Sequence, residues 1–312
     1  MRSLRAPRPA MQAALFSTEQ THFGFKDVPK EEKAGLVGGV FSSVASSYDV
    51  MNDLMSAGLH RVWKDQLVAS LSLPATLRYH LGEAKNSGEV ADSPHFRHLD
   101  VAGGTGDVSF RVMDVINDTL DQTAGSPTRL PPPASVTIID INPDMLTVGE
   151  ERALSRYGPS NVAVRSDVEF GSEPEKPLNF YEGDAQYLPF PSDTFDTYTI
   201  TFGLRNVTDP TLAIREAYRV LRKGGRLKIM EFSHPKNGFV GEIYDKYSFS
   251  VIPAMGEVVA GDRESYQYLV ESIRKWDKQE ALMERIEKEG FVGVKYEDIN
   301  LGVVAVHEGW KM

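Results

Sequence analysis

The segment Asp100-Val101-Ala102-Gly103-Gly104-Thr105-Gly106-Asp107 constrains the fold of this chain more than any other segment. An apolar run that ends in an acid and a glycine cluster is typical of a buried strand that turns sharply into a helix. The three glycines allow the backbone to adopt positive φ and to approach a ligand closely, and the following helix offers unpaired N–H groups. The segment therefore predicts a nucleotide-binding turn, although most short glycine motifs taken alone hold no ligand.

The residues around the glycines indicate which ligand fits. A dinucleotide-binding G-x-G-x-x-G pattern counted from Gly104 needs a third glycine at 109, where this chain has Ser109. Acids at both ends of the turn would repel a pyrophosphate, whereas they suit a ligand with a positively charged amino-acid end. S-adenosylmethionine carries both an ammonium and a sulfonium group. We therefore expect this cofactor to bind at Asp100, Gly103, Gly104 and Gly106.

Length and composition limit the class of protein. The chain has 312 residues, of which 41% are hydrophobic, enough for the core of one large or two smaller domains. Its net charge of −10 argues against nucleic acid as the main partner, because phosphate binding needs a basic face. With no cysteine and no His-x-x-x-His spacing, we expect no metal site. No apolar run approaches the ~18 residues that span a bilayer, so membrane contact would be peripheral.

The first twenty residues differ from the rest of the chain. They contain three arginines and no acid before Glu19, and they lack the long apolar core of a secretory signal. This composition is typical of a mitochondrial presequence, and a disordered basic tail is the alternative. We therefore expect residues 1–20 to address the protein to the mitochondrial matrix.

The remaining residues, 21–312, are expected to form one domain. Three stretches within them are polar or rich in proline, at 80–95, 121–134 and 166–177. They fall between strand and helix signals, so we expect them to be surface loop insertions that leave the fold intact.

Strand and helix signals alternate through the middle of the chain, which predicts an α/β fold with a parallel sheet. The expected strands are 98–102, 136–140, 178–182, 197–202 and 226–231. Two β-rich runs, 291–297 and 302–307, predict an antiparallel hairpin at the sheet edge and bring the sheet to seven strands.

Helical patterns connect and cover these strands. A helix expected over 210–221 ends at Lys223-Gly224-Gly225, which we interpret as a glycine C-cap. Further helices are expected at 239–251, 265–274 and 279–289. Apolar positions at helical spacing over 30–72 predict a helical lead-in that covers the carboxyl ends of the strands as a lid.

In such a sheet a ligand lies across the carboxyl ends of the strands. Asp140 ends the second strand and can accept both ribose hydroxyls of an adenosine, with a role as helix N-cap as the alternative. Asp184 follows the third strand, where a carboxylate can accept from an adenine amino group while the next backbone N–H donates to the ring. The fourth strand runs into Arg205 and Asn206 beside apolar residues, so we expect the chemistry there.

Longer motifs extend this pattern along the chain. They are T-H-F-G-F (21–25), F-S-S-V-A-S-S-Y-D-V-M-N-D-L-M-S (41–56), H-R-V-W-K (60–64), D-V-A-G-G-T-G-D (100–107), F-G-L-R-N-V-T-D (202–209) and Y-D-K-Y-S-F (244–249). On these motifs the chain closely resembles the ubiquinone/menaquinone biosynthesis C-methyltransferases, and their mitochondrial members in particular, from about residue 21 to 312. The glycine turn is shared by many methyltransferases, whereas F-G-L-R-N-V and the serine-rich segment are specific to this family.

The resemblance implies a class I S-adenosylmethionine-dependent methyltransferase with a Rossmann-like seven-stranded sheet. It implies methylation of a ring carbon on a polyprenylated benzoquinol in ubiquinone biosynthesis. The family's cofactor contacts fall on Thr105, Asp140, Asp184, Ala185 and Thr201. The family often has asparagine in place of Asp184 and serine in place of Thr201, and both replacements keep an oxygen acceptor. A peripheral position at the inner membrane, partner enzymes of the same pathway and a possible homodimer are further implications.

The implied reaction needs a base or a phenolate stabiliser, because aromatic carbon is a poor nucleophile unless a neighbouring hydroxyl is deprotonated. We expect Arg205 to stabilise the oxyanion, Asn206 to orient a water and Tyr48 to hydrogen-bond the ring oxygen. A salt bridge for Arg205 and a core position for Tyr48 are the alternatives. Asp53 and His60 are weaker candidates.

A polyprenyl tail needs shelter from water. The residues expected to line its groove, with ordinary helix packing as the alternative, are Val40, Phe41, Met51, Leu54, Met55, Phe249, Ile252 and Met255.

Two other classes of function stay open. An O- or N-methyltransferase would not require Tyr48, Arg205 and Asn206 together, and a non-catalytic scaffold subunit would not need the intact cofactor positions.

Overall fold

The computed structural model describes residues 19–45, 48–79, 96–123, 134–165 and 176–312. The expected targeting segment, apart from its last two residues, lies outside the described residues. The same holds for the expected insertion at 80–95 and for most of the other two insertions. The predictions made for these segments stay predictions.

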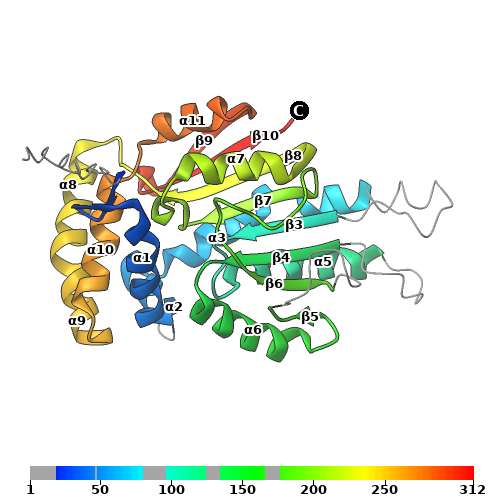
Figure 1. Cartoon of the computed structure of the whole chain (residues 1–312), viewed down its shortest axis with the longest axis horizontal. Coiled ribbons are helices and arrows are strands. Elements are labelled where there is room, and N and C mark those ends of the chain that lie inside the picture. The colour runs from blue at the N-terminus through cyan, green and yellow to red at the C-terminus, as the bar shows by residue number, and fades with distance from the viewer. Residues whose placement is uncertain (1–18, 46–47, 80–95, 124–133, 166–175) are drawn as a thin grey trace, which may run out of the picture.

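A mixed sheet forms the centre of the molecule (Figure 1). Its strands, in spatial order, are β5 (Val162–Ala163), β6 (Leu178–Glu182), β4 (Ala134–Asp140), β3 (Phe96–Val101), β7 (Phe195–Thr201), β8 (Leu221–Phe232), β10 (Val304–Trp310) and β9 (Val292–Ile299). The strands from β5 to β8 pair in parallel, and β10 pairs antiparallel with both β8 and β9. The predicted parallel sheet and C-terminal hairpin are confirmed.

The prediction of seven strands is wrong, because the sheet has eight within the residues that the structure describes. The additional strand β5 is two residues long and pairs with β6 at the edge of the sheet. A run of two residues is too short for any hydrophobic periodicity to show, so sequence patterns do not reveal it.

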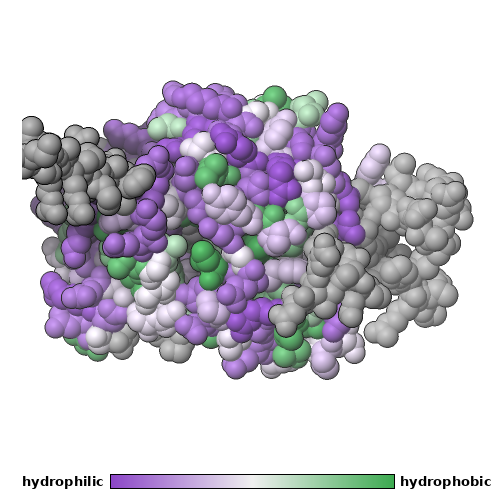
Figure 2. All heavy atoms as spheres, in the orientation of Figure 1, coloured by the Kyte–Doolittle hydropathy of each residue, from purple (hydrophilic) through white to green (hydrophobic). Residues whose placement is uncertain are grey.

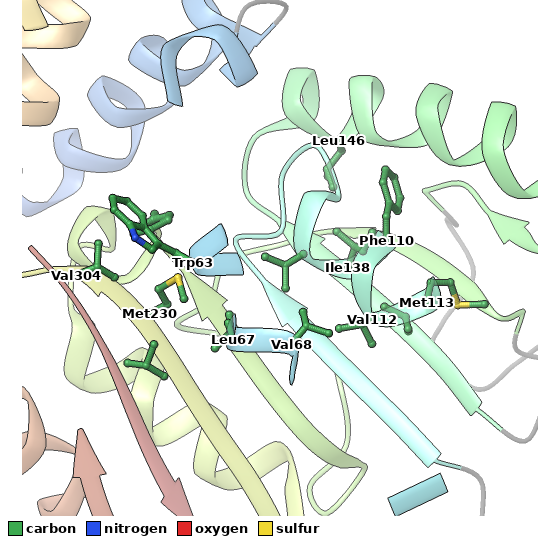
Figure 3. Packing of buried hydrophobic residues seen from close by; sticks show 14 of the residues in the cluster. Trp63, Leu67, Val68, Phe110, Val112, Met113, Ile138, Leu146, Met230 and Val304 are labelled. Atoms are coloured by element: carbon green, nitrogen blue, oxygen red, sulfur yellow. The ribbon is translucent and has the colours of Figure 1, made fainter. Parts of the chain in front are cut away.

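Helices cover both faces of the sheet. Neighbouring strand residues belong to two different hydrophobic clusters: Ile138 and Met230 to one, Ile139 and Ile229 to the other. This alternation follows from the two-residue period of a strand. The helices on the first face are α3 (Leu59–Ser70), α5 (Asp107–Thr123) and α6 (Pro143–Tyr157), and those on the second are α7 (Pro210–Val220) and α11 (Gln279–Lys288). Figure 3 shows Trp63, Leu67 and Val68 of α3 against this core.

A further group of elements lies at one end of the sheet (Figure 1). Its members are the hairpin of β1 (Gln20–Phe23) and β2 (Lys26–Pro29), α1 (Lys30–Val44), α2 (Tyr48–Ser56), α8 (Gly238–Lys246), a π-helical turn (Tyr247–Val251), α9 (Ile252–Ala260) and α10 (Arg263–Lys275). Helices α1, α2 and α3 occupy the stretch 30–72 that was expected to be helical. The β1–β2 hairpin and α9 were not predicted.

On the face shown in Figure 2, hydrophilic residues predominate and hydrophobic ones gather in small separate groups.

The predicted glycine C-cap after α7 is wrong. Helix α7 ends at Val220, and Gly224 and Gly225 lie inside β8, where the pairing with β7 shifts register. Gly224 donates its N–H to the carbonyl of Lys311 at 2.7 Å, and Lys311 donates to the carbonyl of Gly225 at 3.0 Å. The end of the chain thus bonds the backbone around these glycines, which no local pattern at 220–225 reveals.

Candidate active site

A cavity lies between the carboxyl ends of β3, β4, β6 and β7 and the helices α1, α2 and α3. It encloses about 1070 Å³, counting the part that opens to solvent. Its wall combines the glycine turn after β3 with the residues that follow the other three strands. The predicted position of a ligand across the strand ends is where this cavity lies.

The glycine turn has positive φ at two of its three glycines and at Ala102. Gly104 and Gly106 have φ of +49° and +82°, and Gly106 donates its N–H to the carbonyl of Gly103 at 2.9 Å. A Cβ atom on Gly103 would lie 2.8 Å from Ile138, and one on Gly106 would lie 2.6 Å from the ring of Phe110. A larger residue at either position would force these neighbours to shift, so both positions favour glycine. Gly103 and Gly104 line the cavity, whereas Gly106 shapes the turn without lining it.

Asp140 lines the cavity at the end of β4. Its Oδ2 accepts from the N–H of Gly104 at 2.9 Å, and its Oδ1 accepts from the N–H of Asn142 at 2.8 Å. The N-cap of α6 is Asn142, whose side chain accepts from two N–H groups of the first turn. The alternative role of Asp140 as the helix N-cap is therefore wrong. Burial raises the pKa of Asp140 to about 6, against the opposing effect of its backbone hydrogen bonds.

Asp100 is the second carboxylate of the cavity and is almost fully buried. Ser109 donates its hydroxyl to Oδ2 at 2.6 Å, and Thr199 donates to Oδ1 at 2.7 Å. Burial raises the pKa of Asp100 to about 6. Two carboxyls held in a poorly solvated cavity favour a ligand that brings positive charge or hydrogen-bond donors.

The other predicted cofactor positions also line the cavity. They are Thr105, Asp184, Ala185 and Thr201. The carboxylate of Asp184 accepts from the backbone and side chain of Gln186 at 2.9–3.0 Å, which orders the turn after β6. The buried hydroxyl of Thr201 has no hydrogen-bond partner within the part of the chain that the structure describes. A buried polar atom without a partner is costly, so this hydroxyl fits a cavity that binds a polar ligand.

Arg205 lies in the 3₁₀ turn after β7 but outside the lining of the cavity. Its Nη1 donates to Glu231 at 2.9 Å and to the carbonyl of Phe202 at 2.6 Å, and both ionic side chains are at most 3% exposed. The guanidinium also lies over the ring of Phe232, 5.4 Å from its centroid. The salt bridge that the sequence left as an alternative for Arg205 is therefore present.

Asn206 and Tyr48 both line the cavity. The side chain of Asn206 is 8% exposed, and its Oδ1 accepts from the hydroxyl of Tyr268 at 2.9 Å. Tyr48 begins α2, and burial raises its pKa to about 12, so it is a neutral phenol with an O–H to donate at neutral pH. The structure thus brings two of the three predicted catalytic side chains into the cavity.

Sequence reasoning missed Lys64 as a lining residue. This lysine of α3 is 4% exposed, and its Nζ lies 2.7 Å from Asp107 of the glycine turn. The only signal was its place in the H-R-V-W-K motif. The weaker candidates Asp53 and His60 contact each other at 2.8 Å, and neither lines the cavity.

Half of the eight residues expected to line a groove for the tail are core residues, namely Val40, Met51, Met55 and Ile252. Met51, Met55 and Ile252 are at most 5% exposed and belong to the large hydrophobic cluster, so helix packing describes them. Phe41 lines the cavity. The side chain of Leu54 lies outside the described part of the structure.

Neither a metal centre nor a transmembrane helix is present in the described segments. No group of three or more metal-ligating side chains comes together in them. Likewise, none of their helices has both the length and the apolar character needed to cross a membrane.

The strand order, the glycine turn and the acids at the ends of β3 and β4 define a class I S-adenosylmethionine-dependent methyltransferase. The chain belongs to the ubiE/COQ5 methyltransferase family, whose model matches residues 26–311. It is therefore a C-methyltransferase with S-adenosylmethionine as its methyl donor.

Two named relatives are similar over nearly their whole length. The mitochondrial 2-methoxy-6-polyprenyl-1,4-benzoquinol methylase of Oryza sativa subsp. japonica is 46% identical over all of this chain and 95% of the relative. The ubiquinone/menaquinone biosynthesis C-methyltransferase UbiE of Cereibacter sphaeroides is 45% identical over 95% of this chain and 98% of the relative. A solved methyltransferase from Thermotoga maritima shares the fold alone, with a TM-score of 0.52, 17% identity, and coverage of 88% of this chain and all of the other.

Proposed function

We propose that the enzyme transfers a methyl group from S-adenosylmethionine to a ring carbon of 2-methoxy-6-polyprenyl-1,4-benzoquinol in ubiquinone biosynthesis. One observation carries this proposal. Side chains suited to the cofactor and side chains suited to a phenolic ring line the same cavity, in a chain with a full-length relative named for that reaction.

The carboxyl ends of β3, β4 and β6 form the cofactor end of the cavity in this proposal. Asp140 accepts the two ribose hydroxyls, and Asp184 with the N–H of Ala185 recognises the adenine. Asp100 faces the ammonium of the amino-acid end, while Thr201 gains the partner that its hydroxyl otherwise lacks. The raised pKa values of Asp100 and Asp140 support these roles, because each carboxylate gains from hydrogen-bond donors or positive charge in the ligand.

Tyr48, Asn206 and Arg205 act at the ring end. The bound cofactor supplies a methyl group on a sulfonium, which the ring carbon attacks in line as the C–S bond breaks. The ring hydroxyl gives up its proton to water for this attack, and S-adenosylhomocysteine is the leaving group. The carbon afterwards loses its own proton and the ring oxygen regains one, which restores the aromatic ring with a net release of one proton. Tyr48 and Asn206 line the cavity and hold the ring oxygen as its negative charge grows.

Arg205 acts on the ring end from outside the cavity lining. Its guanidinium is bonded to Glu231 and to the carbonyl of Phe202, so it fixes the turn that carries Asn206. Its positive charge also acts on Tyr48 and opposes the rise in that residue's pKa. We therefore propose that Arg205 acts through this turn and through its charge, without direct contact with the ring oxygen.

We further propose that the enzyme works in the mitochondrial matrix, against the inner membrane and beside other enzymes of the pathway. The basic and acid-free composition of residues 1–18 supports the mitochondrial address, as does the mitochondrial relative. A fluorescent fusion that begins at Gln20 is expected to stay in the cytosol, while the full-length fusion enters the matrix. Entry of the shortened fusion would place the address elsewhere.

One experiment tests the reaction. The purified full chain is incubated with methyl-labelled S-adenosylmethionine and a short-tail demethyl-benzoquinol, and the label is located by NMR. We expect it on the ring carbon. Label on an oxygen or nitrogen would favour another small-molecule methyltransferase, and binding of the cofactor without any transfer would favour a scaffold subunit.

A further inference from the structure

The side-chain amide of Asn206 is hydrogen-bonded by a residue that is far away in the sequence. Tyr268 of α10 donates its hydroxyl to Oδ1 of Asn206 at 2.9 Å, across 62 positions of sequence. The ring of Tyr268 stacks on Phe23 of β1, with centroids 4.1 Å apart and planes inclined by 16°. Burial raises the pKa of Tyr268, so its hydroxyl keeps its proton throughout the neutral range. A buried donor on a fixed ring therefore occupies the oxygen end of the amide.

The opposite end of the amide has a second neighbour that sets its direction. Nδ2 of Asn206 lies 3.4 Å from the carbonyl oxygen of Phe202, which also accepts from Arg205 at 2.6 Å. If the amide were turned around, its own carbonyl oxygen would face that of Phe202, and two acceptors would repel each other. The oxygen end therefore faces Tyr268, and an N–H of the other end is left for the cavity.

We infer that Tyr268 is a positioning residue for methyl transfer, because it fixes Asn206 with an amide N–H turned toward the ring oxygen of the substrate. The inference rests on the function proposed above. An N–H at this place stabilises the ring oxygen as it becomes negative, whereas a carbonyl oxygen there would repel it. Tyr268 itself does not line the cavity, so it acts through Asn206 alone.

The chain supplies a matched control on the same helix. Tyr266 lies two positions from Tyr268 and is also fully buried. Its hydroxyl has no hydrogen-bond partner among the residues that the structure describes. Tyr266→Phe and Tyr268→Phe therefore remove the same atom from the same helix, but only the second removes a contact with Asn206.

The first test compares these two variants in the full chain, with S-adenosylmethionine and the short-tail benzoquinol. We expect Tyr268→Phe to lower kcat about tenfold, the size of effect of one lost hydrogen bond that acts on the transition state. The dissociation constant of S-adenosylmethionine should change less than about twofold, so the change in binding free energy is no larger than that of a weak surface contact. Tyr266→Phe should leave both constants unchanged. Equal kcat values for the two variants would overturn the inference.

The second test asks whether Tyr268 acts through Asn206. In an Asn206→Ala background the amide is gone, so Tyr268→Phe should lower kcat by less than about twofold further. A purely structural tyrosine would lower kcat by its full factor in either background. Additive effects of Asn206→Ala and Tyr268→Phe would therefore overturn the inference.

A third measurement separates this inference from the proposed function. If the wild-type enzyme binds its cofactor but transfers no methyl to the benzoquinol, the proposed function fails. NMR of the Asn206 side-chain amide then tests its contact with Tyr268. We expect its two proton signals to shift in Tyr268→Phe and to stay in place in Tyr266→Phe, and unchanged signals in both variants would overturn the inference.

Discussion

The two ends of the cavity are built from different kinds of contact. At the cofactor end, Asp140 bonds the N–H groups of Gly104 and Asn142, and every group involved belongs to a strand end or the turn that follows it. At the ring end, Asn206 depends on Tyr268, and Arg205 depends on Glu231. The cofactor end is therefore built from the ends of adjacent parallel strands, whereas the ring end also depends on Tyr268 of α10, a helix outside the sheet.

This difference explains what the sequence revealed. The strand ends and glycine turn follow from periodicity and from backbone conformations that only glycine adopts, so Asp100, Asp140 and Asp184 were placed correctly at the strand ends. The bond of Tyr268 to Asn206 joins positions 62 apart and comes from α10, which lies outside the sheet. This pairing is decided by how α10 packs against the turn after β7, which neither strand periodicity nor a turn pattern encodes.

The β1–β2 hairpin and Lys64 were missed for the same reason. The hairpin is stabilised by the stacking of Phe23 on Tyr268, and Lys64 reaches the cavity only because α3 packs beside the glycine turn. Their role becomes visible once the helices are placed against the sheet.

The largest expected effect concerns Arg205. Arg205→Met alone leaves the Glu231 carboxylate buried and unpaired, which costs ~3–5 kcal/mol of stability. A loss of turnover in this variant could then come from unfolding and not from catalysis. The double variant Arg205→Met with Glu231→Gln removes both charges. We expect it to bind S-adenosylmethionine nearly as the wild type does but to lose turnover about a hundredfold, because the turn that carries Asn206 loses its anchor and Tyr48 loses the nearby positive charge. Steady-state kinetics with calorimetry on the same protein measures both.

A conservative variant refines this prediction. Arg205→Lys keeps the positive charge for Glu231 but loses the planar fork that also bonds the carbonyl of Phe202, so turnover should recover only in part. Normal turnover in the double variant would show that Arg205 does not contribute to catalysis. A loss of cofactor affinity in proportion to activity would show that the two ends of the cavity are not separate.

The next effect concerns Asp140. Asp140→Ala removes the proposed acceptor of two ribose hydroxyls, so affinity for S-adenosylmethionine should fall about 5- to 150-fold, the equivalent of ~1–3 kcal/mol. Turnover at saturating cofactor should change far less. Asp144→Ala is the matched control, since Asp144 is exposed in the first turn of α6 and does not line the cavity. Equal dissociation constants for the two variants by calorimetry would refute the assignment.

The smallest effect is a pH dependence of cofactor binding. Asp100 and Asp140 have a pKa of about 6 because of burial, and the proposed contacts need their charged forms. Above pH 6 the dissociation constant should be flat, and below it should rise by up to about tenfold per pH unit for each carboxyl that must ionise. Calorimetry from pH 5 to 8 measures this.

The sign of the stability effect separates binding from unfolding. A carboxyl whose pKa is raised in the folded state binds its proton more tightly there than in the unfolded chain, so protonation of these two groups stabilises the ligand-free fold as pH falls through 6. Weaker binding at low pH therefore does not come from unfolding caused by these groups. Asp140→Asn should make the rise in the dissociation constant less steep, and an unchanged slope would remove Asp140 from the cofactor end.

A crystal structure with S-adenosylhomocysteine bound tests the division of the cavity most directly. The account predicts both ribose hydroxyls within hydrogen-bonding distance of Asp140, and the sulfur turned toward Tyr48 and Asn206. An adenosine in contact with Tyr48 and Asn206, or a ribose away from Asp140, would contradict it.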